Sequence, residues 1–291
     1  MGLYAIAVWL LCGLVTDHLW LQFACFVISS YLMVELNNSN ALIRIYSRMV
    51  SCSFIMMVCM STFLLQSSKG MMLSICVVMS FVMAFLSYQD KYSMGRIFYS
   101  FMSIGIGSMI DVSVLFFVPV MWLAMFFHLQ SMTLRTFISS LFGLICPYWF
   151  VAVYLIYTND ITLAVEHFSQ LAVFGKVANF SQVPVSALVS ICYITILSVV
   201  GIIHYLRNRV FDKTRTRMFY NTFILFDIFT IAFIILQPQH YATMLIILIV
   251  TTSPLIAHFI ALTHTWITNL AFKVIVATAL SLTIINILQL I

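Results

Sequence analysis

The chain has 291 residues, of which 64% are hydrophobic and only 7% are charged, and its mean hydropathy is +1.13. So few polar side chains cannot coat a water-soluble particle of this size, which excludes soluble protein classes. The net charge of +5 does not indicate a nucleic-acid partner, because the basic residues lie in short loops between apolar runs and report membrane orientation.

Apolar runs follow one another along the whole chain. They cover 3–16, 19–34, 48–65, 71–87, 97–110, 112–128, 136–157, 186–206, 218–236, 242–262 and 270–290. We expect an all-α, polytopic transmembrane bundle that forms one domain over 1–291, with about eleven helices and a range of nine to eleven. The runs 3–16, 19–34, 97–110 and 112–128 are short, so each could be tilted, re-entrant or fused into a broken helix. The first run lacks the basic start and cleavage site of a secretory signal, so we expect it to be retained.

The basic residues predict the orientation of the bundle. The loop 207–217 carries five of them, and the positive-inside rule places it in the cytoplasm. Counting helices outward from this loop brings Arg44, Arg48, Lys91, Arg96, Arg135 and Lys273 to the same side, and only Lys69 and Lys176 to the other. We therefore expect a cytoplasmic N-terminus, a periplasmic C-terminus and a location in the bacterial inner membrane.

The segment 158–185 is the one extended stretch outside the predicted spans. Within it, apolar residues recur at helical spacing from 161 to 172, while Glu166 and His167 occupy the other side. This pattern is typical of an amphipathic helix that lies flat in the headgroup region. Two roles remain open for this outer loop: a lid that only packs against the bundle, or a surface that binds substrate through Glu166 and His167.

The predicted orientation places several polar residues on the outer face. Asp17 and His18 form an acid–base pair in the first outer turn, Asp111 separates two apolar runs, and His240 precedes another. One interpretation is a polar site with Asp17, His18 and Asp111 as catalytic residues and His240 as a substrate-binding residue. The other is that acids are spread over both faces and only the bases are sorted.

Asp227 lies near the middle of the run 218–236, where an uncompensated carboxylate is costly. Its candidate partners are Asn221, Tyr220 or a polar group on another helix. An intramembrane acid is a functional-site hypothesis, here a substrate-binding one, and the alternative is a protonated carboxyl that only bonds a neighbouring helix.

Metal and cofactor motifs are missing from the sequence. The histidines show neither H-x-x-x-H nor H-E-x-x-H spacing, and His258 with His264 is a weak signal. The cysteines form no C-x-x-C pair. We predict no bound metal and no cofactor, and the absence of a glycine-rich phosphate loop excludes ATP-driven transport by this chain alone.

The stretch 91–160 resembles an uncharacterised family of polytopic inner-membrane proteins of Bacteroidetes. The resemblance rests on F-x-x-x-G from Phe101 to Gly105, on the run that ends at Trp122, and on R-T-F-I-S-S-L-F-G-L-I-C-P-Y from Arg135 to Tyr148. The turn L-N-N-S-N at 36–40 is similar as well. This resemblance implies a membrane bundle and no known activity.

The same layout is distantly similar to GT-C type glycosyltransferases that use polyprenyl-phosphate sugars. In those enzymes an acid in the first outer loop assists attack on the donor, and Asp17 is the matching position, although their loop is longer than the turn found here. The resemblance implies membrane lipids and a polyprenyl-linked saccharide as partners and a place in envelope glycoconjugate assembly. Two alternatives remain: a non-catalytic subunit that binds other membrane subunits, and a proton-coupled transporter that uses Asp227.

Overall fold

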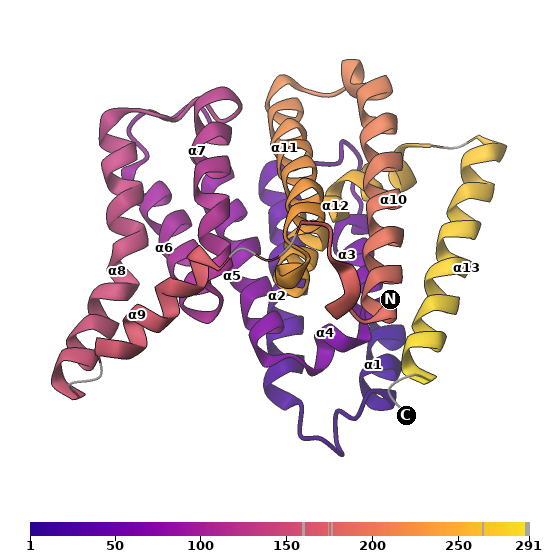
Figure 1. The fold of residues 1–291 in the computed structure, drawn as a ribbon. Helices are drawn as coiled ribbons and strands as arrows, with labels where there is room; N and C mark the ends of the chain where they lie inside the picture. Colours follow the sequence, from indigo (N-terminus) through magenta and orange to yellow (C-terminus); the bar gives the residue numbers. More distant parts are fainter. Residues whose placement is uncertain (159–160, 174, 176, 264, 289–291) are drawn as a thin grey trace.

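A computed structural model describes residues 1–158, 161–173, 175, 177–263 and 265–288, and within these ranges the chain is all helical, without β-strands (Figure 1). Lys176, expected on the outer side, and His264, part of the weak metal signal, lie outside the described residues. The α-helices are α1 (Gly2–Leu11), α2 (Trp20–Asn40), α3 (Met49–Met60), α4 (Thr62–Gln66), α5 (Ser68–Phe85), α6 (Met94–Ile110), α7 (Val118–Phe127), α8 (Leu134–Thr158), α9 (Ile161–Ser169), α10 (Val185–Asn208), α11 (Thr214–Leu236), α12 (Tyr241–Leu262) and α13 (Trp266–Leu288). Short 3-10 helices are η1 (Val112–Phe117), η2 (Gln170–Ala172), η3 (Phe180–Gln182), η4 (Arg209–Phe211) and η5 (Pro238–His240).

The protein is a multi-pass helical membrane protein. In the described part of the chain, seven helical segments are long and apolar enough to cross a membrane, namely Trp20–Asn40, Ser68–Phe85, Leu134–Thr158, Val185–Phe211, Thr214–Leu236, Pro238–Leu262 and Trp266–Leu288. The four other apolar runs hold shorter elements: α1, the α3–α4 pair, α6, and η1 with α7. A span of about 20 residues matches the hydrocarbon core, so these shorter elements do not meet that length alone.

Local sequence explains the two breaks in the shorter elements. Ser61 leaves helical geometry and divides the run 48–65 into α3 and α4, and Ser67 then caps α5 by accepting a hydrogen bond from the Gly70 N–H at 3.1 Å. Asp111 is extended and caps η1 by accepting the Ser113 N–H at 2.9 Å. At Ser67 and Asp111 a polar side chain thus replaces a backbone partner, whereas the Ser61 hydroxyl has no hydrogen-bond partner among the described residues.

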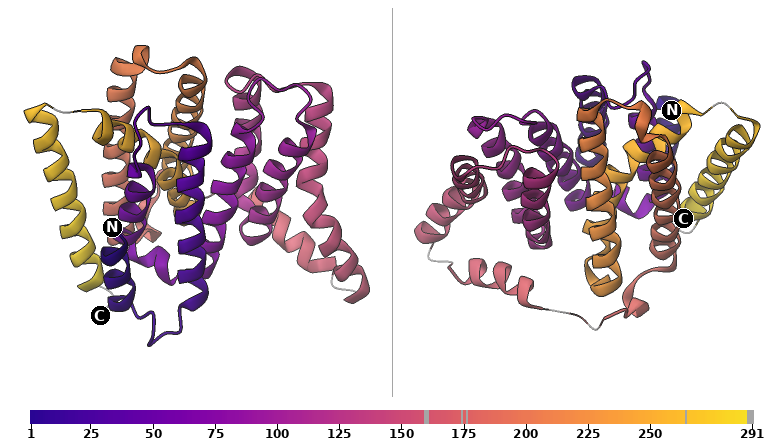
Figure 2. Two further views of the ribbon diagram at one scale, coloured as in Figure 1. Left: turned by 180° about the vertical axis from the view of Figure 1, so that it is seen from behind. Right: turned by 90° about the horizontal axis from the view of Figure 1, so that it is seen from above.

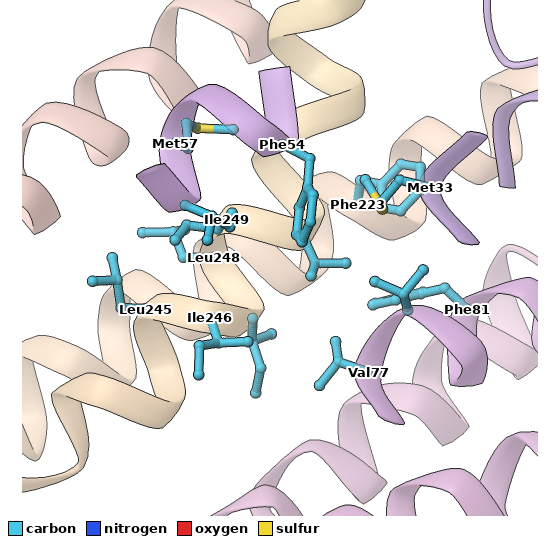
Figure 3. Close-up of a cluster of buried hydrophobic side chains, with 14 of the residues drawn as sticks. Met33, Phe54, Met57, Val77, Phe81, Phe223, Leu245, Ile246, Leu248 and Ile249 are labelled. Atoms are coloured by element: carbon cyan, nitrogen blue, oxygen red, sulfur yellow. The ribbon is translucent and has the colours of Figure 1, made fainter. Parts of the chain in front are cut away.

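Helix α12 occupies the centre of the bundle, where it packs against α3, α5, α10 and α11. Its span is 89% buried, which is unusual for a helix in lipid and identifies it as the core of the fold. Figure 3 shows the side chains that meet there, with Ile246 and Ile249 of α12 near Phe54 of α3, Phe81 of α5 and Phe223 of α11. The apolar residues around most of α12 therefore reflect packing on nearly all sides.

Helices α6 and α8 approach each other closely because small residues face both backbones. A Cβ added at Gly105 would lie 2.8 Å from the Leu144 carbonyl oxygen, and one at Gly143 would collide with the Phe98 carbonyl oxygen. Gly107 instead faces Leu73 and Cys76 of α5. Helix α6 is thus held between α5 and α8 through small residues, as is common in membrane bundles.

Contacts between distant residues gather the basic connections at one end of the bundle, here called the basic end. Arg44 donates to the Phe211 carbonyl at 3.5 Å, which joins the α2–α3 and α10–α11 connections. The Gln89 N–H donates to the Leu129 carbonyl at 2.8 Å, which joins the α5–α6 and α7–α8 connections. Tyr88 contacts the Phe219 ring of α11, with ring centroids 5.5 Å apart, and links the two groups. Figure 1 shows the α7–α8 and α10–α11 connections at the top.

The segment between α8 and α10 follows the outside of the bundle rather than entering it. In the view from above in Figure 2, α9 and the residues after it form an arc from α8 to α10. The Ala178 N–H donates to the Ile235 carbonyl at 3.1 Å, and the Gly175 N–H donates to Gln237 Oε1 at 2.9 Å. These bonds tie the arc to the end of α11, opposite the basic end.

Candidate functional site

Asp111 anchors a polar cluster at the end of the bundle opposite the basic end. Its Oδ1 accepts the Ser113 N–H at 2.9 Å and the Ser113 hydroxyl at 2.6 Å. Its Oδ2 accepts the hydroxyl of Thr243, in the first turn of α12. One half-buried carboxylate therefore joins the α6–η1 break to the central helix.

The electrostatics of the cluster keep Asp111 ionised. Burial acts to raise the pKa of Asp111, but the hydrogen bonds from Ser113 and Thr243, together with the proximity of His240, outweigh this effect, so the pKa lies below the ordinary value. The carboxylate is consequently a weak proton acceptor and a strong partner for a cation or a hydrogen-bond donor. Of the sequence-predicted residues, Asp111 and His240 are brought together here.

An apolar pocket of about 470 Å³ lies between α6, α8 and α9. Met109 of α6, Tyr148 and Leu155 of α8, and Leu163 and Phe168 of α9 line it. Met109 precedes Asp111 by two residues, and η2 packs against η1, so the pocket adjoins the Asp111 cluster. An apolar pocket beside a polar cluster suits a ligand that has a long apolar chain and a polar head.

His167 provides a polar group at the wall of the pocket. Its Nε2 lies 2.9 Å from the Ser108 carbonyl oxygen, to which it donates as the Nε2–H tautomer. The Ser108 hydroxyl donates to the Gly105 carbonyl at 2.8 Å, which leaves it to accept from the Tyr148 hydroxyl at 2.7 Å. Glu166, the neighbour of His167, is exposed. Helix α9 thus turns His167 toward the bundle and leaves Glu166 at the surface.

The two faces of α9 differ from the sequence-based expectation. Leu163, Ala164, His167 and Phe168 line the pocket, whereas Val165, expected on the apolar face, is 66% exposed. The hydrogen bond from His167 to the Ser108 carbonyl accompanies this orientation of α9. His167 therefore lies on the pocket side of the helix.

Asp17 and His18 lie in the turn between α1 and α2, and both are exposed. His18 has a left-handed backbone, with φ of 53°. Among the described residues, no hydrogen bond or ion pair joins either side chain to Asp111, His167 or His240. No described hydrogen bond or ion pair therefore joins this pair to the Asp111 cluster, and the catalytic role expected of Asp17 and His18 stays a prediction.

Asp227 of α11 is fully buried and has partners on two neighbouring helices. Ser198 of α10 donates to its Oδ2 at 2.5 Å and Thr252 of α12 donates to the same oxygen at 3.1 Å. Thr251 of α12 donates to Oδ1. Of the partners considered from sequence, a polar group on another helix is the one found.

Asn221 and Tyr220, the other partners considered for Asp227, point elsewhere. Asn221 Oδ1 accepts from the Tyr205 hydroxyl at 3.5 Å, and the Tyr220 hydroxyl donates to the Pro254 carbonyl at 3.4 Å. Both lie on α11 toward the basic end. They do not share the carboxyl with the hydroxyls of α10 and α12.

Sequence reasoning did not single out a second buried acid, Asp212, as a site residue. It follows η4 and lies 3.1 Å from His258 Nε2 through its Oδ2, and both side chains are almost completely buried. His204 of α10 stands beside His258, with ring centroids 5.4 Å apart. The available signal was that Asp212 is the one acid in a strongly basic connection.

No protein-family model, curated protein or solved structure matches this chain. Within the described part of the chain, no three His, Cys, Asp or Glu side chains gather as metal ligands. The chemistry that the site can perform is therefore inferred from its own groups: an ionised carboxylate, two imidazoles, several hydroxyls and an adjoining apolar pocket.

Proposed function

We propose that this protein binds a lipid-linked substrate, such as a polyprenyl-linked saccharide, at the outer face of the bacterial inner membrane, as a component of envelope glycoconjugate assembly. The observation that carries the proposal is the apolar pocket between α6, α8 and α9 beside the Asp111 cluster. The pocket accommodates part of an isoprenoid chain, and the polar groups accommodate the headgroup. Membrane lipids are the competing ligands.

The distribution of charge supports the orientation in this proposal. The connections that meet at the basic end carry Arg44, Arg48, Lys91, Arg209 and Lys213. Positive loops remain in the cytoplasm, which places Asp111 and α9 outside. The N-terminus is then cytoplasmic and the C-terminus periplasmic.

Contacts at both ends support about eleven crossings in this proposal. Gln22, at the start of α2, donates to Ser68, at the start of α5, at 3.0 Å, so both helices begin at the same end. The α3–α4 pair must return across the bundle between them. The bond from Gln89 to Leu129 likewise makes α6 and η1–α7 a return pair. The four shorter elements therefore complete the crossings that the seven long ones begin.

The proposal assigns different roles to the polar residues. Asp111 and His240 contact the headgroup through charge and hydrogen bonds, and His167 and Glu166 flank the entry beside α9. Asp17 and His18 are the catalytic pair implied by the GT-C resemblance, and Asp111 is a further catalytic candidate. Loss of function in Asp17→Asn cells, with normal expression of the variant, supports that assignment, whereas full activity in them removes it.

A photo-crosslinkable undecaprenyl phosphate tests the binding proposal in nanodiscs of the full chain. Leu163→Trp fills the pocket, whereas Val165→Trp places the same bulk on the exposed side of α9. We expect crosslinking to wild type and to Val165→Trp, and at least a several-fold loss in Leu163→Trp. Equal crosslinking of all three chains contradicts the proposal, as does labelling that a phospholipid with saturated chains displaces equally well.

A role as a non-catalytic subunit is the second candidate. It is favoured by α13, whose span is only 28% buried and which stands at the edge of the bundle in Figure 2. A partner helix could cover this face in a larger complex. Stoichiometric copurification of another membrane subunit in mild detergent supports this role, and an active isolated monomer contradicts it.

A further inference from the structure

Three acids from different parts of the chain meet the central helix α12. Asp111 is bound by Thr243, Asp227 by Thr251, and Asp212 by His258. The three α12 residues are eight and seven positions apart, or about 12 Å and 10 Å along the axis at about 1.5 Å per residue. Because both steps are close to two helical turns, the three contacts fall on one side of α12 and form a polar column through the bundle.

The middle member of this column has no positive partner. Asp227 is 0% exposed, and among the described residues no Lys, Arg or His side chain forms an ion pair with it. An ionised carboxylate in such surroundings is costly unless a positive charge compensates it. A small cation or a proton supplies that compensation.

Around Asp227 there are also more hydrogen-bond acceptor oxygens than hydroxyl protons that can be donated to them. Thr251 has one hydroxyl proton, yet its oxygen lies within bonding distance of Asp227 Oδ1, of the Ile247 carbonyl at 2.9 Å and of the Leu248 carbonyl at 3.3 Å. When that proton turns to the backbone, the Thr251 oxygen and Asp227 Oδ1 face each other as two acceptors. A positive ion between or beside them satisfies both.

The proline of α12 leaves a backbone oxygen without its helical partner one residue before Thr251. The oxygen belongs to the Val250 carbonyl, because Pro254 has no N–H. Carboxylate, hydroxyl and free carbonyl oxygens are the hard ligands that a small cation prefers, and interrupted helices supply them in membrane transporters.

Other titratable groups on the elements packed around Asp227 lie away from it. They are Cys192, Tyr193, His204, Tyr205 and Arg207 on α10, Arg215, Arg217 and Tyr220 on α11, Tyr241 and His258 on α12, His240 in η5, and Lys69 and Cys76 on α5. Helix α7, which packs against α11, carries none. The groups that contact the Asp227 carboxyl are the hydroxyls of Ser198, Thr251 and Thr252. A change in its protonation with pH or with cations can therefore be assigned to Asp227 itself.

The ends of the column lie near water or the headgroup region, although the side chains of Asp212 and His258 are themselves buried. At the basic end, a groove of about 660 Å³ is lined by His204, Arg207 and Asn208 of α10 and by residues near the start of α13. His204 adjoins His258, which binds Asp212. At the other end Asp111 is only half-buried. The buried centre can thus exchange a cation with either side through small movements of α10 and α12.

We propose that Asp227, Ser198, Thr251 and Thr252 form an intramembrane binding site for one monovalent cation, either a proton or a sodium ion that competes for the same carboxylate. This site is separate from the lipid-binding pocket of α8 and α9. Its test therefore stands or falls independently of the proposed function.

The test is infrared difference spectroscopy of the purified full chain in detergent, with Asp227→Asn to assign the carboxyl band. We expect the carbonyl band of protonated Asp227 to disappear reversibly as the pH is raised within the range in which the protein stays folded. If Na⁺ shifts the midpoint of this titration downward and K⁺ does not, the site binds sodium as well as a proton. If neither ion shifts it, the ligand is the proton alone.

Thermal unfolding gives a second, independent readout. A sodium site predicts that Na⁺, at a pH where Asp227 is ionised, raises the Tm of wild type and of Asp90→Asn, whose acid is exposed, but not that of Asp227→Asn. Thr251→Val should weaken the Na⁺ response, while Thr251→Ser retains it. The proposal is overturned if the Asp227 band stays constant over the whole folded pH range and Na⁺ changes neither the band nor the Tm.

Discussion

Thr243 donates its hydroxyl hydrogen bond to Asp111, although 132 positions separate the two residues in the chain. The bond ties the first turn of α12 to the break between α6 and η1. It therefore connects the most buried helix to the polar cluster beside the apolar pocket.

Removing the Thr243 hydroxyl should break the link between the Asp111 cluster and α12 but leave the other hydrogen bonds of Asp111 in place. In Thr243→Val, Asp111 keeps both hydrogen bonds from Ser113 but loses its link to α12. A lost hydrogen bond to a charged, half-buried acceptor lowers the free energy of unfolding by about 1–2 kcal/mol. Equilibrium unfolding in detergent measures the loss. Thr243→Ser retains the hydroxyl and should stay near wild type; equal losses in both variants would count against the bond.

The lowered pKa of Asp111 predicts a dependence of stability on acid. Because its folded-state pKa lies below the ordinary value of 3.8, the ionised carboxylate stabilises the fold above that value. This contribution is lost as the pH falls through the folded-state pKa. Thermal scans should therefore show wild type more stable than Asp111→Asn from neutral pH down to about pH 4, with the gap closing in stronger acid. A gap that widens toward acid contradicts the assignment.

The order of apolar runs could be predicted from the sequence because hydropathy is a local property. Each predicted run contains helix, and the breaks at Asp111 and Ser67 coincide with polar capping residues. The length of a run was a less informative guide to membrane spans than its hydropathy. In the described part of the chain, seven segments reach membrane-spanning length, and the shorter ones depend on their neighbours. Each short helix packs against neighbours, as α3 does against α12 and α6 against α5 and α8.

The polar contacts could be predicted only in part because they form between distant segments. Asp227 was recognisable as an acid in an apolar run, but its partners on α10 and α12 depend on how three helices pack. Asp212 and His258 are 46 positions apart and give no local pattern. His167 was placed on a solvent face by periodicity, whereas its bond to Ser108 turns it inward.

Glycine at position 143 should be essential to the contact between α6 and α8. Gly143→Ala places a methyl group against the Phe98 carbonyl oxygen, so the two backbones must separate. We expect a loss of about 1–3 kcal/mol in the free energy of unfolding, as in other overpacked contacts. Gly95→Ala is the matched control, because a Cβ there meets nothing within 4 Å. It should be neutral or slightly stabilising, and similar losses in both variants would exclude the steric cause.

The Asp212–His258 pair should matter far more than the exposed Asp90–Arg96 pair, although both join an acid to a base. Asp212→Ala leaves His258 Nε2 without its partner in a buried site where Nδ1 already has none among the described residues. An unsatisfied buried donor costs about 1–3 kcal/mol, whereas an exposed ion pair at 3.5 Å contributes at most about 1 kcal/mol. Unfolding of Asp212→Ala and Asp90→Ala in the same detergent compares the two directly. If Asp212→Ala lowered the free energy of unfolding no more than Asp90→Ala does, water would have to reach His258. The α12 column would then be open to water at the basic end rather than packed.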